Sequence, residues 1–153
     1  MTQPSSKAPE NDRLLRWQPQ ATVFLRNQPR LDRIVALDLR DTNIGELGLG
    51  GIERCALLRW LSLANTRLAE VPTVLRQLPR LQILDFSNNV VSHAKAMYQV
   101  QRLSVHFLRL SGNPISRLQL YRPFVISLLP TLKVLDDFIC CDAEYIQNSM
   151  FPD

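Results

Sequence analysis

Cysteine and histidine are scarce in this sequence, and each shortage excludes a class of protein. The three cysteines, Cys55, Cys140 and Cys141, are odd in number and lack the spacing of a disulfide framework, so we expect free thiols in a reducing compartment. The two histidines, His93 and His106, have no cysteine or carboxylate at metal-ligand spacing around them. The sequence therefore predicts no metal site and no cofactor.

Glycine is also rare, and four of the five glycines fall between Gly45 and Gly51. This stretch superficially resembles a phosphate-binding turn. The third glycine position is occupied by Glu53, however, whose carboxylate would oppose a pyrophosphate, and no βαβ unit follows. A loop is the expected structure. No nucleophile elbow is present either, so we predict a protein that is not an enzyme.

Long hydrophobic runs are missing. The longest, such as Phe124 to Leu129, fall far short of the roughly 20 residues that a membrane helix needs. The residues that follow Met1 contain no apolar segment of the kind found in a secretory signal. These features predict a soluble, cytoplasmic protein that does not associate with a membrane.

Leucine is present in abundance and at regular spacing. Four copies of one pattern, and the start of a fifth, carry apolar residues at matching positions: Ile34, Leu37, Leu39 and Ile44; Leu58, Leu61, Leu63 and Leu68; Leu81, Leu84, Phe86 and Val91; Val105, Leu108, Leu110 and Ile115; Leu132 and Leu135. The copies begin 24, 23, 24 and 27 residues apart, within the range of about 20 to 29 residues for a leucine-rich repeat. We predict an α/β fold: a short leucine-rich-repeat solenoid with a curved parallel sheet on its concave face, loops and short helices on its convex face, and helical caps.

A polar residue follows the second core leucine of each copy by three positions. It is Thr42, Thr66, Asn89 or Asn113, and its side chain can satisfy backbone groups that the turn leaves unpaired. Asparagine offers more hydrogen bonds than threonine, so the first two coils are expected to be held less tightly. The return segments are expected to bury convex-side apolar residues: Leu47, Leu49, Ile52, Val71, Leu75, Leu78, Met97, Val100 and Leu103.

The two ends of the chain differ from the repeats in composition. Residues 1–19 are predicted to be a flexible arm, and residues 20–33 an amino-terminal cap in which a short helix carries Phe24 and Leu25. Repeats occupy 34–117, and a carboxy-terminal cap occupies 118–153. The cap is expected to open with a helix whose buried face is Leu118, Tyr121, Val125, Leu128 and Leu129.

This last region carries a specific resemblance. Its matching residues are Asn113-Pro114, Tyr121-Arg122, Val125-Ile126, Leu129-Pro130, Leu132, Leu135-Asp136 and Glu144. They resemble the carboxy-terminal cap of the intracellular leucine-rich-repeat class, which includes phosphatase-one regulatory repeats, the spliceosomal A-prime subunit, acidic nuclear phosphoproteins and axonemal dynein light chain. The resemblance covers roughly residues 31 to 145, and implies a curved solenoid that binds other proteins without catalysing a reaction.

Period-two alternation identifies the residues on the concave face. The first row is Ala36, Trp60, Ile83, Phe107 and Val134; the second is Asp38, Ser62, Asp85, Arg109 and Asp136; the third is Arg40, Ala64, Ser87 and Ser111. The first row is apolar where a solvated surface would be polar. We predict a groove that receives a helix or an extended segment of a partner protein, with contacts at Trp60, Ile83, Phe107, Val134, Asp38, Asp85, Arg109, Asp136 and Arg40. The alternative is that Trp17 or residues 145–151 cover this row.

The chain carries a net charge of +4, which raises the question of nucleic acid. Most of this excess lies in residues 1–33, with six basic and three acidic side chains. The concave rows carry aspartates that would repel phosphates, so direct binding of nucleic acid is not expected there.

The functional prediction is a non-catalytic adaptor that docks a partner segment within a larger assembly. The resemblance points first to a ciliary or cytoskeletal complex. Two alternatives stay open: a nuclear ribonucleoprotein subunit of the spliceosomal A-prime type, which would place the chain in the nucleus, and a regulatory subunit of a phosphatase.

Overall fold

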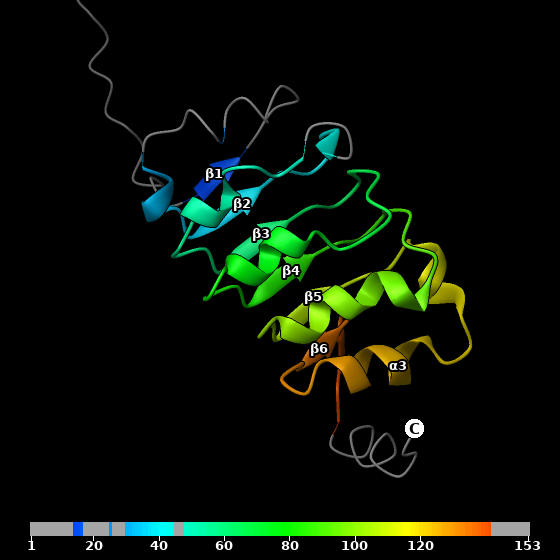
Figure 1. The fold of residues 1–153 in the computed structure, drawn as a ribbon. Helices are drawn as coiled ribbons and strands as arrows, with labels where there is room; N and C mark the ends of the chain where they lie inside the picture. The colour runs from blue at the N-terminus through cyan, green and yellow to red at the C-terminus, as the bar shows by residue number, and fades with distance from the viewer. Residues whose placement is uncertain (1–13, 17–24, 26–29, 45–47, 142–153) are drawn as a thin grey trace, which may run out of the picture.

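The computed structural model, which describes residues 14–16, 25, 30–44 and 48–141, contains one sheet of seven strands (Figure 1). The strands lie side by side in the order of the sequence. They are β1 (Leu14–Arg16), β2 (Ala36–Asp38), β3 (Trp60–Ser62), β4 (Ile83–Asp85), β5 (Phe107–Arg109), β6 (Val134–Leu135) and β7 (Phe138–Ile139). All neighbouring pairs are parallel except the last, β6 with β7. Each repeat thus contributes one strand.

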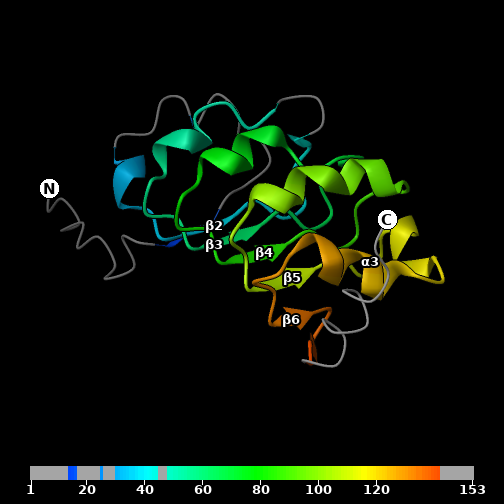
Figure 2. The ribbon, with the colours of Figure 1, turned by 60° about the horizontal axis from the view of Figure 1, so that its bottom comes forward.

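Short helices form the layer opposite the sheet (Figure 2). They are the 3-10 helices η1 (Leu31–Arg33), η2 (Ile52–Arg54), η3 (Thr73–Gln77), η4 (Ala94–Arg102) and η5 (Pro114–Arg117), and the α-helix α3 (Tyr121–Leu128). The return segments are short, which favours tight 3-10 turns over long α-helices. This arrangement confirms the predicted α/β leucine-rich-repeat solenoid.

The core lies between these two layers. The inward-facing strand residues form two buried columns: Leu37, Leu61, Leu84, Leu108 and Leu135, and then Leu39, Leu63, Phe86 and Leu110. The predicted convex residues are buried against them, from Leu49 and Ile52 to Val100 and Leu103; Leu47 lies outside the described residues. Burying one such side chain contributes about 1.5–3 kcal/mol, so the stacking of coils is the main source of stability.

Asparagine and threonine side chains hold the turn at the end of each strand. Thr42 and Thr66 each donate one hydrogen bond to the carbonyl three residues before them, Leu39 and Leu63. The Asn89 amide nitrogen donates to the carbonyls of Leu63, Phe86 and Ser87. The asparagines therefore connect one coil to the preceding one.

A left-handed residue precedes each of these turn residues by one position. Asp41, Asn65, Asn88 and Gly112 all have φ between 54° and 78°. Asp, Asn and Gly adopt this conformation more readily than other residues. At Gly112 a Cβ atom would also lie 2.1 Å from the Oδ1 atom of Asn88, so both backbone and space favour glycine.

The carboxy-terminal cap joins α3 to the hairpin of β6 and β7. The Tyr121 hydroxyl donates to Asp136 Oδ2 at 2.5 Å, while Arg122 donates to the carbonyls of Leu135 and Ile139. Burial, followed by this hydrogen bond, raises the pKa of Tyr121. The residues that resemble the carboxy-terminal cap of the leucine-rich-repeat class therefore form hydrogen bonds with one another. The predicted helix face needs one correction: Leu118 precedes α3 and is 52% exposed, because η5 ends there in an extended conformation.

Tyr121→Phe is expected to lower the free energy of unfolding by about 1.5 kcal/mol, since it removes a hydrogen bond to a carboxylate. Urea denaturation measures this loss as a lower midpoint with an unchanged slope. Tyr98→Phe is the matched control, because Tyr98 is 51% exposed. Equal midpoints for the two variants would show that the Tyr121–Asp136 contact does not hold the cap.

The amino-terminal end differs from the prediction at one segment. Residues 14–16, assigned to the flexible arm, form β1 and pair in parallel with β2, Leu15 opposite Leu37. The strand covers the backbone edge that β2 would otherwise expose. Leu25, predicted to belong to the cap, is buried. The remaining residues of 1–29 lie outside the described residues, as do 142–153.

Candidate functional site

An open hollow of about 320 Å³ lies over the concave side of β3 to β6. Seven of the nine predicted contact residues line it: Arg40, Trp60, Ile83, Asp85, Phe107, Arg109 and Val134. The parallel register places Trp60, Ile83, Phe107 and Val134 side by side. One residue from each of four coils thus meets at one surface, which sequence spacing alone predicted.

The apolar row is accessible. Phe107 is 42% exposed, and Trp60, Ile83 and Val134 are half-buried. None of them belongs to the buried core. The two segments that were considered as covers, Trp17 and residues 145–151, lie outside the described residues.

Asp38 differs from its predicted place at the rim of the groove. Only 5% of it is exposed. Its carboxylate accepts hydrogen bonds from Arg40 Nη2 at 2.7 Å and Nε at 2.9 Å, and this contact raises the pKa of Arg40. Because Asp38 is buried and paired, Arg40 is the member of this pair that reaches the hollow.

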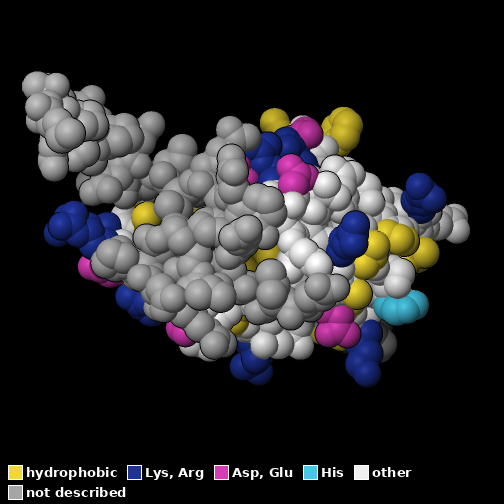
Figure 3. Space-filling model, turned by 90° about the horizontal axis from the view of Figure 1, so that it is seen from above, with side chains coloured by type: hydrophobic (Ala, Val, Ile, Leu, Met, Phe, Trp, Pro, Cys, Tyr) yellow, Lys and Arg dark blue, Asp and Glu magenta, His cyan; other side chains and the backbone are white. Residues whose placement is uncertain are grey.

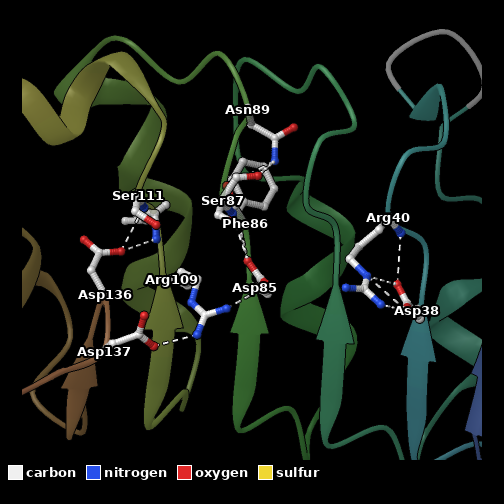
Figure 4. A network of polar contacts seen from close by, with 11 residues as sticks. Asp38, Arg40, Asp85, Phe86, Ser87, Asn89, Arg109, Ser111, Asp136 and Asp137 are labelled. Carbon is white, nitrogen blue, oxygen red and sulfur yellow. Dashed lines mark hydrogen bonds and ion pairs between the residues drawn. The ribbon is translucent and has the colours of Figure 1, made fainter.

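Arg109 lies between two aspartates (Figure 4). Its guanidinium is 2.5 Å from Asp137 Oδ1 and 3.6 Å from Asp85 Oδ2, and the hydrogen bond to Asp137 is the main reason its pKa is raised. Asp85 also accepts from the backbone and hydroxyl of Ser87. One arginine thus pairs with two aspartates, and the cluster keeps a net negative charge.

Asp136 is a capping residue rather than a member of the second row. The strand β6 ends at Leu135, and Asp136 has a φ of 51°. Its Oδ1 atom accepts from the backbone of Leu110 and Ser111, and its Oδ2 atom from Tyr121. Asp136 does not line the hollow, whereas the neighbouring Asp137, which was not among the predicted contacts, does.

Ser62 lies beneath the surface of the hollow and has an unusual hydroxyl. The residue is fully buried, and its Oγ atom has no hydrogen-bond partner among the described residues. It occupies the second row, in register with Asp38 and Asp85. A buried polar group without a partner costs about 1–3 kcal/mol. A buried hydroxyl beneath the groove therefore lacks a hydrogen-bond partner among the described residues.

Ser62→Ala is expected to leave the protein as stable as before or to stabilise it by up to about 1 kcal/mol, because it removes this unsatisfied group. Thermal unfolding followed by circular dichroism provides the measurement. The contrasting variant is Ser87→Ala, which loses the bond to Asp85 and should melt at a lower temperature. A lower melting temperature for Ser62→Ala would mean that the hydroxyl has a partner.

The described residues show little reactive chemistry. Burial raises the pKa of Cys55 to about 11, so its thiol stays protonated near neutral pH. No cluster of three metal-ligating side chains occurs in the described part of the chain, and none of its helices is long and apolar enough to cross a membrane. On the face in Figure 3, the Lys and Arg side chains that can be seen are scattered, with Asp and Glu among them.

Comparison with known proteins adds the family. No family model matches the chain. The U2 small nuclear ribonucleoprotein A' of Mycosarcoma maydis is 35% identical over 107 residues, which are 69% of this chain and 43% of that protein. The acidic leucine-rich nuclear phosphoprotein 32 family member A of Drosophila pseudoobscura pseudoobscura is 30% identical over 115 residues, 74% of this chain and 44% of that protein.

The solved SNF/U2A' complex of Drosophila melanogaster contains a similar fold. Its match has a TM-score of 0.73 and 20% identity, and covers 90% of this chain and 79% of that chain. The chain is a leucine-rich-repeat protein. Its sequence resembles that of the A-prime proteins. The chain spans less than half the length of the two curated relatives. The leucine-rich-repeat chain thus has relatives that are named as nuclear proteins.

Proposed function

We propose that this leucine-rich-repeat chain is a protein-binding adaptor that holds a segment of a partner protein on its concave face. The observation that carries the proposal is the row of Trp60, Ile83, Phe107 and Val134 along the open hollow. Aromatic side chains at the centre of an interface contribute most of the binding energy. Accessible apolar side chains in line favour a partner with an apolar face of its own.

The assembly we propose is a nuclear ribonucleoprotein. Both curated relatives are named as nuclear proteins, and one is a small nuclear ribonucleoprotein subunit. This supports the alternative weighed from the sequence over the ciliary or cytoskeletal assignment, for which neither name gives support. No observation favours the phosphatase alternative.

Affinity purification from nuclear and cytoplasmic extracts, followed by mass spectrometry, tests the proposal. We expect wild-type protein to recover an RNA-binding protein from the nuclear extract, and the Phe107→Ala variant to recover much less of it. Leu120→Ala is the matched control, because Leu120 is 70% exposed and lies outside the hollow. Equal recovery by all three proteins would contradict docking on the concave face, and recovery of dynein or tubulin components would contradict the nuclear assembly.

A further inference from the structure

Five exposed cations lie along one edge of the sheet. They are Arg33, Arg59, Arg80, Arg102 and Lys133. Each one precedes a different strand, β2 to β6, by one to five residues. Parallel strands begin at the same edge of a sheet, so each coil brings one positive charge toward this edge. Arg59 and Lys133 adjoin their strands directly, Arg80 lies in the connection before β4, and Arg33 and Arg102 end η1 and η4. We call these five residues the basic edge.

Backbone hydrogen bonds join the part of the basic edge that adjoins the strands, from Arg59 through Gln82 and His106 to Lys133. The Gln82 amide donates to the Arg59 carbonyl at 2.9 Å, the His106 amide to Gln82 at 2.8 Å, and the Lys133 amide to His106 at 2.7 Å. This ladder runs directly beside the apolar row, because Arg59 precedes Trp60 and Lys133 precedes Val134. One ligand in the groove would contact both.

The cations of the basic edge are not neutralised by the described residues. The ion pairs found there all involve Arg40 or Arg109. Those two arginines lie at the opposite edge, where the strands end, together with Asp38, Asp41, Asp85, Asp136 and Asp137. The groove therefore has an unpaired basic edge on one side and a more acidic, internally paired edge on the other.

The two edges are spaced for one helix. Strands of three residues, at about 3.3 Å per residue, separate the edges by roughly 10 Å, and an α-helix with its side chains is about 10–12 Å wide. We infer that the groove selects an amphipathic helix of a partner protein with Asp or Glu along the flank that faces the basic edge. This inference rests on the proposed docking function and adds the charge and the orientation of the partner.

Nucleic acid fits this surface less well. A phosphate backbone would satisfy the basic edge but would leave the apolar row uncovered, and it would approach the aspartates across the groove. A helix with an apolar face and one acidic flank matches the row and the edge together, and charge complementarity of this kind sets both the partner and its orientation.

Binding of fluorescein-labelled peptides to the full chain tests the inference by fluorescence anisotropy. Three helical peptides share one leucine face at i, i+3, i+4 and i+7 and differ only in one flank, which carries Glu, Gln or Lys. We expect the Glu peptide to bind about tenfold more tightly than the Gln peptide and the Lys peptide to bind most weakly, with differences that shrink as salt rises. A labelled oligouridylate is the nucleic-acid probe, and we expect it to bind more weakly than the Glu peptide.

Charge reversal separates this inference from the docking function. Arg59→Glu/Arg80→Glu should weaken the Glu peptide about tenfold and strengthen the Lys peptide. Arg76→Glu/Arg117→Glu makes the same change of charge on exposed convex arginines and should change neither. If the Glu and Gln peptides bind equally, docking stands and the charge inference fails. If no peptide binds, the docking function itself fails, and tighter binding of oligouridylate would overturn the inference in favour of a phosphate ligand.

Discussion

Asn89→Ala is expected to lower the free energy of unfolding by about 3 kcal/mol or more, more than alanine at any other polar position among the described residues. Asn89 is 4% exposed. Its Oδ1 atom accepts hydrogen bonds from Thr66 N at 3.1 Å and Leu68 N at 3.0 Å, and its amide nitrogen donates to three carbonyls. Alanine would leave the backbone amides of Thr66 and Leu68 without partners, at about 1–3 kcal/mol for each group that water cannot reach. The three carbonyls would each lose one donor and keep another.

Thermal unfolding should show a melting temperature lower by about 6–12 °C, at roughly 2–4 °C per kcal/mol for a chain of this size. Asn89→Thr should fall between wild type and alanine, since Thr42 and Thr66 make the one carbonyl bond that a hydroxyl can donate at this position. Asn89→Asp should be at least as destabilising as alanine, because a carboxylate would face three carbonyl oxygens. Asn113→Ala should cost less, since Asn113 makes three such bonds. An unchanged melting temperature for Asn89→Ala would show that the asparagine does not hold the coils together.

Spacing alone predicted most of the fold, for a physical reason. Leu37, Leu61, Leu84 and Leu108 recur at one position because stacked coils bury equivalent side chains against each other, so one repeat describes them all. The residues with positive φ before the turns were not predicted, although the sequence carries a signal for them. Asp, Asn and Gly tolerate positive φ, and one of them precedes each turn residue: Asp41, Asn65, Asn88 and Gly112. The strand β1 was missed because Leu14–Arg16 belongs to no repeat.

For the candidate site, the alternation of inward and outward strand residues predicted only which face of the sheet each side chain lies on. Alternation placed Trp60 and Phe107 on the concave face, where the structure has them. It could not show that Asp38 accepts hydrogen bonds from Arg40, or that Asp136 accepts them from Tyr121 and a backbone amide. Those contacts join residues that face each other only after the chain turns, and an aspartate at a strand end is equally suited to a partner and to its own turn.

Trp60→Ala and Phe107→Ala are each expected to weaken binding of the partner segment by about 2 kcal/mol, or roughly 30-fold. Both side chains border the hollow, with Ile83 between them in the sheet. Calorimetric titration of the partner segment recovered by affinity purification measures the loss. The double variant should lose about 4 kcal/mol if the two rings act independently, and less if they share one contact.

The same variants should remain folded, because Phe107 is 42% exposed and Trp60 is half-buried. Truncation of a partly exposed ring removes less burial than truncation of Phe86, which is fully buried one strand away and whose replacement by alanine would cost about 3–5 kcal/mol. Circular dichroism and urea denaturation therefore accompany the titration. If Phe107→Ala unfolds as readily as Phe86→Ala, its ring serves the core. If it folds and binds like wild type, the concave row has no part in recognition, and the unsatisfied Ser62 hydroxyl beneath it is only a local cost of packing.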